Sequence, residues 1–481
     1  MRARSVVGVL VVVATVCAGA MWFLGATAPV GSRTDYAAEI ARVARESQGA
    51  HADVANGWEA FEAALGIPGR IAKEIEDRER RVDEERWRQG PDPEEWMGSS
   101  EAFFTRQHGL TARDAMVREE FWQRVEAADL DASVRGARAF TVFVRPREDR
   151  IGDVFEREGE SASVTADVVA TYGLAGDARV FARVQAERML RAAEAGDWAG
   201  ASARMEDAVF ASRIMLAQSD LLSGLVGMAM HGVMESAAIR IMATMDDVPP
   251  EFVLEMLDVF GSAPEVDVEA MVAVSQLEVR EMRESLYREM KRHVVGTGRL
   301  AVWRVTGRMR EQGELIETCG EYLRNLSGAP VPEIDEWIET WKMQCAAMGS
   351  VEGLFADVSL QPASVVRQVE LAGSRGEAFC VIAALWAYAR VHGAPPKSME
   401  MLVPEFLEAA PEDVYAPGSA IRYIAGTTMR DVVLYSVGED GVDDGGVSER
   451  MELQSGRIVR TGGDLVYLSP EMWRVTPVEE E

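Results

Sequence analysis

The spacing of apolar and polar positions predicts helices over most of the chain. Apolar residues recur every three to four positions from Thr34 to about Asp131, and again from Asp177 to Met245, as they do in amphipathic helices. We expect the first stretch to break at Gly66–Gly69, because proline and glycine interrupt helices. The charged run 73–88 is typical of a solvated helix face with i,i+4 ion pairs.

The second stretch predicts an αα-hairpin, with one helix ending near Gly196 and the next starting at Trp198. A third helix follows, with Ser219 or Asp220 as its N-cap. Because methionine fills irregular gaps in helical cores, we interpret the methionines of this region as core residues. They are Met205, Met215, Met228, Met230, Met234 and Met242. Another long helix is expected from Val266 to about Val295.

Between the two helical stretches the pattern loosens. Phe140–Val144 is rich in β-forming residues and stops before Pro146, which predicts an isolated strand. Gly159–Ala166 is expected to be a loop. The whole of 136–176 is therefore predicted to be irregular, with one possible strand.

The N-terminus has the composition of a membrane-spanning segment. Residues 6–28 are apolar, and as a helix they would be about 34 Å long, against a hydrocarbon core of about 30 Å. Arg2 and Arg4 precede this run and acidic residues follow it, so we expect a cytoplasmic N-terminus and an extracytoplasmic body. A cleaved signal peptide is the alternative, with Ala18-Gly19-Ala20 or Ala26-Thr27-Ala28 before the cleavage point.

Composition narrows the function classes. The net charge of -29 argues against nucleic-acid binding, since such a surface repels phosphates. No metalloprotease, serine-hydrolase or phosphate-loop motif is present in the sequence, and no two of the five histidines lie close enough along the chain to form a local metal pair. Gly296–Ala301 matches a dinucleotide fingerprint, but a charged helical pattern precedes it where a strand is needed, so we interpret it as a link between helices. We expect His231 to be a core or boundary residue of an apolar helix.

The C-terminal part changes from helix to strands. A helical stripe from Glu377 stops at Gly393, before two prolines. Two runs rich in β-forming residues, 421–424 and 432–436, predict an antiparallel pair. An acidic, glycine-rich loop, 438–446, follows the second run.

This order resembles the globular part of type II secretion major pseudopilins. The resemblance spans about residues 377–467, and its most specific piece is Tyr435-Ser436-Val437-Gly438-Glu439-Asp440-Gly441. It implies a small α+β module with two or three strands. The apolar N-terminal segment has no pseudopilin leader motif, so the resemblance does not extend to filament assembly. The whole layout is similar to that of membrane-anchored, helix-rich bacterial proteins with a tail of this kind.

The acidic loop is the one candidate metal site. Its carboxylates, Glu439, Asp440, Asp443 and Asp444, are clustered among glycines, and calcium prefers such oxygen ligands. The spacing is not that of an EF-hand, because Val442 takes the place of the third-position ligand. The resemblance to pseudopilins, which bind calcium in the corresponding loop, implies a calcium site here. A solvated acidic turn, in which the glycines serve backbone geometry alone, is the other interpretation.

The sequence therefore predicts a mainly α protein with an N-terminal transmembrane helix, an extracytoplasmic helical body and a small C-terminal α+β module. The predicted parts are 1–31 (anchor), 32–135 (helical), 136–176 (irregular), 177–374 (helical domain), 375–470 (α+β module) and 471–481 (acidic tail). For function, we expect a structural or interaction protein of the cell envelope with a protein partner. The alternatives are an envelope hydrolase with a carboxylate site assembled by the fold, and a component of a secretion or pilus apparatus.

Overall fold

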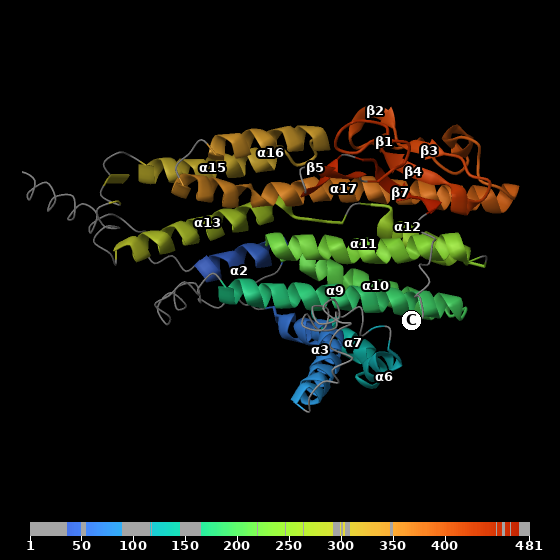
Figure 1. Ribbon diagram of the computed structural model, residues 1–481, viewed down its shortest axis with the longest axis horizontal. Helices are drawn as coiled ribbons and strands as arrows, with labels where there is room; N and C mark the ends of the chain where they lie inside the picture. The colour runs from blue at the N-terminus through green and yellow to red at the C-terminus, as the bar shows by residue number, and fades with distance from the viewer. Residues whose placement is uncertain are drawn as a thin grey trace, which may run out of the picture.

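The structure is a computed structural model, and within the residues it describes the protein is mainly helical with small antiparallel sheets (Figure 1). It describes residues 36–49, 54–88, 116, 118–144, 165–218, 220–245, 247–262, 264–291, 299, 302–303, 308–346, 350–448, 450–454, 457–461 and 463–470. The predicted fold class is confirmed to this extent. The predicted anchor at 6–28 and the glycine-rich link at 296–301 lie outside the described residues, apart from Arg299.

Twelve α-helices lie in the described part of the chain. They are α2 (Tyr36–Ser47), α3 (Trp58–Arg88), α6 (Glu119–Ala127), α7 (Leu130–Ala137), α9 (Thr165–Glu194), α10 (Trp198–Leu216), α11 (Leu221–Thr244), α12 (Pro250–Phe260), α13 (Val268–Lys291), α15 (Arg308–Asn325), α16 (Val331–Ala346) and α17 (Ser350–His392). The strands are β1 (Glu412–Asp413), β2 (Ala416–Ala420), β3 (Arg422–Ile424), β4 (Val433–Ser436), β5 (Arg450–Gln454), β6 (Arg457–Thr461) and β7 (Leu465–Leu468).

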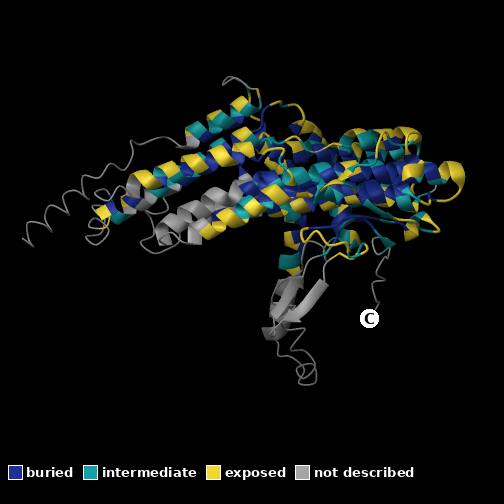
Figure 2. Cartoon of the chain, turned by 90° about the horizontal axis from the view of Figure 1, so that it is seen from above, coloured by how far each residue is buried: buried dark blue, intermediate teal, exposed yellow. Residues whose placement is uncertain are grey.

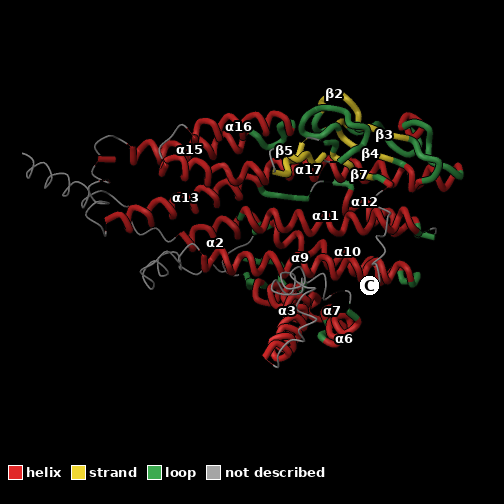
Figure 3. Tube along the Cα trace, viewed as in Figure 1, coloured by secondary structure: helices red, strands yellow, loops and turns green. Residues whose placement is uncertain are grey.

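The long helices are stacked in layers (Figure 1). Helices α9, α10 and α11 pack against one another in the middle, and α3 packs against α9 with α6 and α7 beside it. On the other side, α17 packs against α11 and carries α15 and α16. The strands gather beside the C-terminal half of α17 (Figure 3). The α11–α17 contact therefore joins the helical body to the strand region.

The predicted αα-hairpin is confirmed as α9 and α10. The Asp197 side chain caps α10 by accepting a hydrogen bond of 2.9 Å from the Gly200 N–H, and Gly196 in the turn has a φ of 74°. Asp220 is the N-cap of α11, accepting from the Ser223 N–H at 2.9 Å. The structure thus decides between the two N-cap candidates that the sequence left open.

Helix α11 is the central helix of the packed body. Among the described helices, its segment Leu222–Thr244 alone is long and apolar enough to span a membrane by length and composition. However, 67% of its most apolar window is buried inside the protein. Figure 2 shows the buried residues concentrated in the interior of the packed helices. The apolar character of α11 is explained by contacts on several of its sides.

The interpretation of the methionines as core residues is confirmed. All six side chains are buried, with at most 8% of the surface exposed. Met189, Met205, Met234, Met242 and Met256 belong to one large apolar cluster that also includes Leu434 and Leu468 from the strands. The helical body and the strand region therefore share a core, which disfavours their independent movement.

The predicted break at Gly66–Gly69 is wrong, because α3 runs without interruption from Trp58 to Arg88 and includes Pro68. The glycines serve close packing instead. A Cβ on Gly69 would lie 2.0 Å from an Asp177 carboxylate oxygen of α9. The apolar residues on both sides of Pro68 are buried against α6, α7 and α9, and this packing compensates for the hydrogen bond that proline removes.

The predicted irregular region 136–176 is partly wrong, because α9 begins at Thr165 and not near Asp177. Leu174 and Ala175 in this added part are buried in the cluster with α3. The glycines at 173 and 176 obscured the helical pattern in the sequence. In the predicted strand Phe140–Val144, Val142 makes a single parallel bridge with Asn56, so the segment is extended but pairs at one position only.

The predicted antiparallel pair is confirmed as β3 and β4, in which Arg422 lies opposite Tyr435 and Ile424 opposite Val433. Strand β7 adds to the other edge of β4. The predicted helix end is also confirmed, since α17 stops at His392 and Gly393 follows with a φ of 80°. The boundary predicted between 374 and 375 falls inside α17, which extends through the helical body into the strand region.

Candidate functional site

The predicted acidic loop lies on the surface between β4 and β5 and is held by a buried aspartate that the sequence analysis did not single out. Asp464, only 3% exposed, accepts hydrogen bonds from the Asp444 N–H at 3.2 Å and the Gly446 N–H at 2.6 Å. Gly438 has a φ of 72°, and a Cβ there would lie 2.0 Å from the Gly463 carbonyl oxygen. The loop glycines therefore serve backbone geometry and close approach.

Three of the four predicted carboxylates have different partners. Glu439 forms an ion pair with Arg367 of α17. Asp440 accepts from the N–H of Val442 at 3.0 Å, within its own turn. Asp443 accepts from the Tyr435 hydroxyl at 2.9 Å, and this bond is the main reason that its pKa is lowered.

Within the described residues, no group of three His, Cys, Asp or Glu side chains is arranged to hold a metal ion. The calcium site therefore stays a prediction from the sequence. What the structure adds is the attachment of the loop, because Arg367 also bonds Asp335 of α16 at 2.7 Å and the Tyr415 hydroxyl at 2.8 Å. Arg367 therefore connects the acidic loop to α16 as well as to α17.

A larger candidate site is a cleft of about 1010 Å³ at the seam between the helical body and the strand region. Its lining comes from α11, α17 and β7, with Arg183 contributed by α9. The α11 residues of the lining recur at helical spacing, so one face of α11 forms the floor. They are Leu225, Met228, Ala229, Gly232, Val233, Glu235, Ser236, Ile239 and Arg240.

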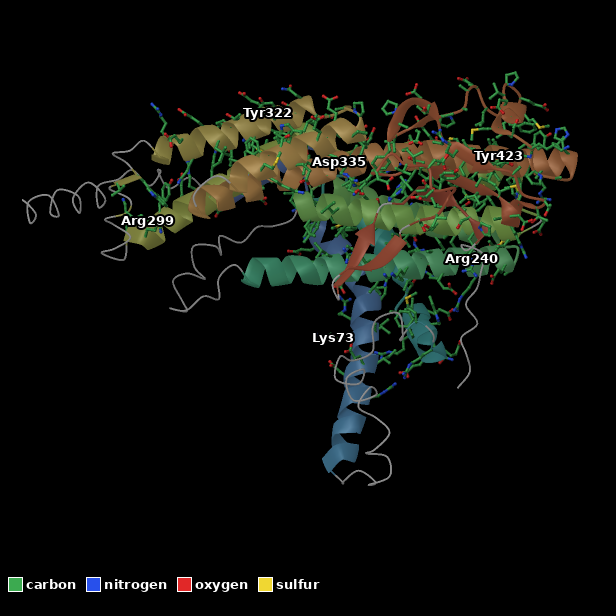
Figure 4. All side chains as sticks on the ribbon, turned by 45° about the horizontal axis from the view of Figure 1, so that its top comes forward. Lys73, Arg240, Arg299, Tyr322, Asp335 and Tyr423 are labelled. Atoms are coloured by element: carbon green, nitrogen blue, oxygen red, sulfur yellow. The ribbon has the colours of Figure 1, made fainter. Side chains whose placement is uncertain are left out.

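Three arginines line this cleft: Arg183, Arg240 and Arg375. Figure 4 shows Arg240 toward the C-terminal end of α11, well away from Lys73 on α3. Elsewhere in the described structure many arginines are paired with acids, as Arg188 is with Asp131 at 2.8 Å. Among the described residues, none of the three cleft arginines has an ion pair or a side-chain hydrogen bond.

Glu235 is the acidic residue of the lining. Its side chain is only 9% exposed, and burial raises its pKa to about 7, while the charge of Arg375 opposes this rise. No described residue donates a hydrogen bond to its carboxylate. Below neutral pH this side chain is therefore uncharged and presents a hydroxyl donor to the cleft.

The strand side of the cleft carries Tyr467 of β7. The Tyr467 and Ser374 hydroxyls are 2.5 Å apart, and this bond fixes β7 against α17. Burial raises the pKa of Tyr467, so its phenol stays neutral at physiological pH. The rest of the lining is largely apolar and includes Ile382 and Leu465.

The polar residues of this site are far apart in the chain, so no sequence pattern indicates the site. Arg183, Glu235, Arg375 and Tyr467 come from four elements that only the tertiary fold brings together. The nearest signal was His231, one turn before Glu235 in α11. It lies at the boundary of the core, as expected, with its ring 5.2 Å from that of Phe260.

No family model, curated protein or solved structure matches the chain.

Proposed function

We propose that the chain is a single-pass, membrane-anchored protein that acts in the cell envelope by binding, with residues 6–28 as its anchor. The N-terminus is cytoplasmic and the body is extracytoplasmic in this proposal, because arginines precede the apolar run and acids follow it. The observation that supports a binding role is the cleft, whose lining includes Arg183, Arg240 and Arg375, none of which forms an ion pair within the described residues.

The cleft favours binding over hydrolysis. Hydrolysis by carboxylates generally needs two of them, one acting as acid and one as base or nucleophile. Glu235 is the one acidic side chain in the described lining. It lies among arginines and apolar residues, an arrangement suited to holding an anion.

A hydrolase remains the second candidate, because the raised pKa of Glu235, about 7, suits a general acid. In that role Glu235 would protonate a leaving group, and Glu235→Gln would abolish turnover without loss of substrate binding. If the protein only binds its ligand, Glu235→Gln changes the affinity for that ligand, and there is no turnover to lose. A role in a secretion or pilus apparatus rests on the resemblance of the C-terminal module to pseudopilins.

The topology is tested by adding a protease to intact spheroplasts that carry the full chain. We expect digestion of the body beyond about Ser32, since it lies outside the cytoplasmic membrane. A body protected from the protease until the membrane is broken would contradict the export. An N-terminus starting at Met21 or Pro29 in the mature protein would show cleavage and replace an anchored protein by a secreted one.

The binding role is tested by filling the cleft. A Cβ on Gly232 has no atom within 4 Å, so Gly232→Trp places an indole in the open cleft. Gly136 of α7 is equally open and lies outside the lining, which makes Gly136→Trp the control. Native mass spectrometry of the chain released from its own membrane should show a small-molecule adduct on the wild type and on Gly136→Trp. An adduct retained by Gly232→Trp would place the binding site elsewhere.

A further inference from the structure

The charge of the cleft is opposite to that of the molecule. The chain has 79 acidic residues and 50 basic ones, yet the lining contains three arginines and one acid. That acid, Glu235, has a pKa of about 7, so below neutral pH the charges of the three arginines have little to offset them. A cationic cleft in an anionic surface attracts and selects anions.

The three arginines of the cleft differ in how far their side chains are exposed. Arg183 and Arg240 are exposed, whereas Arg375 is half-buried and close enough to Glu235 and Tyr467 to lower the pKa of both. Guanidinium groups bind phosphate oxygens in pairs of parallel hydrogen bonds. A phosphate head group bound by Arg375 would also lie near the Glu235 carboxyl and the Tyr467 hydroxyl.

The remaining lining is apolar and wide. It consists mainly of aliphatic side chains, among them Leu225, Met228, Val233, Ile239, Ile382 and Leu465. An inorganic anion would leave this apolar surface in contact with water, so the lining suits a ligand with an apolar body.

We propose that the cleft binds an amphiphile with a phosphate head group, its head among Arg183, Arg240 and Arg375 and its apolar body along α11. This inference rests on the proposed function, because it names the ligand class of the same cleft. The head group can come from a membrane phospholipid or from a soluble organic phosphate, and the two sources share this chemistry. Below neutral pH the Glu235 carboxyl is largely protonated and donates a hydrogen bond to the phosphate instead of repelling it.

The test is isothermal titration of the full chain in non-ionic detergent at pH 6.5. The probes are dihexanoyl phosphatidic acid, dihexanoyl phosphatidylcholine and inorganic phosphate. We expect phosphatidic acid to bind at least tenfold more tightly than either of the other two. Phosphatidylcholine has the same apolar body with a zwitterionic head, and inorganic phosphate has the anion without the body.

Variants locate the binding. Arg240→Gln combined with Arg375→Gln should weaken phosphatidic acid binding at least tenfold, and Gly232→Trp should abolish it. Arg179→Gln is the control, because Arg179 is exposed, lies one turn from Arg183 on α9 and is not in the lining. Thermal unfolding of each variant verifies that it is folded.

The outcomes separate the two proposals. Equal binding of phosphatidic acid and phosphatidylcholine, both lost in Gly232→Trp, would overturn the phosphate selectivity and leave the cleft as a binding site. Binding of phosphatidic acid that survives Gly232→Trp would overturn both. Absence of phosphatidic acid binding would overturn the ligand class, while the adduct experiment on the native membrane would still decide the binding role.

Discussion

His231 and Glu235 lie one helical turn apart on α11, and burial moves their pKa values in opposite directions. The pKa of His231 is lowered to about 4 and that of Glu235 is raised to about 7. In both cases burial disfavours the charged form. Near pH 6 both side chains are therefore neutral in the folded protein, so the centre of α11 carries no charge from either of them.

This arrangement predicts how stability depends on pH. Between about pH 4.5 and 7 the folded protein keeps a proton on Glu235 that the unfolded chain has lost, so the contribution of Glu235 to stability falls as pH rises. His231 has the opposite effect between about pH 4 and 6.5, where the unfolded chain holds the extra proton. Above pH 7 the cost of ionised Glu235 is complete.

Glu235→Gln should therefore stabilise the protein increasingly from pH 5 to pH 8, by on the order of 3 kcal/mol at the upper end. Urea unfolding at several pH values measures this difference. Glu251→Gln serves as the control, since Glu251 is exposed on α12. A Glu235→Gln advantage that is constant with pH would show that the carboxyl does not titrate in this window.

The contact between α17 and the end of α12 predicts a strict need for glycine at position 376. A Cβ on Gly376 would lie 2.8 Å from the Phe260 carbonyl oxygen and 3.2 Å from the Ser262 backbone nitrogen. Because these backbone atoms cannot shift without distorting the contact between α12 and α17, Gly376→Ala should destabilise the protein by about 1–3 kcal/mol. Gly176→Ala, in the interior of α9 with open space around its Cβ, should stabilise by about 0.5–1 kcal/mol. If Gly376→Ala stabilised the protein, as Gly176→Ala is expected to do, this result would contradict the close contact.

Asp413 is predicted to be the main polar support of the strand region. It is 1% exposed and accepts hydrogen bonds from the Tyr415 N–H at 2.9 Å, the Val437 N–H at 3.1 Å and the Ser436 hydroxyl. Asp413→Ala leaves these buried donors without a partner and should cost about 3 kcal/mol in urea unfolding. Glu405→Ala, at an exposed position, should change stability by less than about 0.5 kcal/mol. Equal effects of the two substitutions would refute this role.

The calcium hypothesis for the acidic loop predicts a calcium-dependent melting temperature. Calcium bound at Glu439, Asp440, Asp443 and Asp444 would favour the native state by preferential binding. The full chain should then melt at a higher temperature in millimolar calcium than in chelator, and Asp440→Ala combined with Asp443→Ala should remove the difference. The same midpoint in both conditions would leave the loop as a solvated acidic turn.

The structural features that depend on neighbouring residues were predictable from the sequence. The start of α10 at Trp198, the end of α17 at Gly393 and the β3–β4 pair were predictable, because each depends on residues close together in the chain. The continuity of α3 through Pro68 was not, since contacts with other helices compensate for the local cost. The start of α9 at Thr165 was not predictable either, because the glycines at 173 and 176 interrupt the helical pattern.

The two candidate sites differ in how far they could be predicted from the sequence. The acidic loop is a continuous segment and was found from its composition, but its buried support, Asp464, lies after the β5–β6 pair. The cleft combines residues from α9, α11, α17 and β7, and no local pattern connects Arg183 to Tyr467. Its discovery required the tertiary structure, because an arginine without a partner cannot be recognised in a sequence.

The most direct test of the account is to locate the ligand by photolabelling. A phosphatidic acid analogue with a diazirine in its acyl chain is irradiated with the full chain, and the labelled peptides are identified by mass spectrometry. We predict labels within 225–240 of α11 and 368–382 of α17, lost in Gly232→Trp and kept in Gly136→Trp. Labels on elements that do not line the cleft, or labels on α11 that persist in Gly232→Trp, would contradict the assignment of the cleft as the binding site.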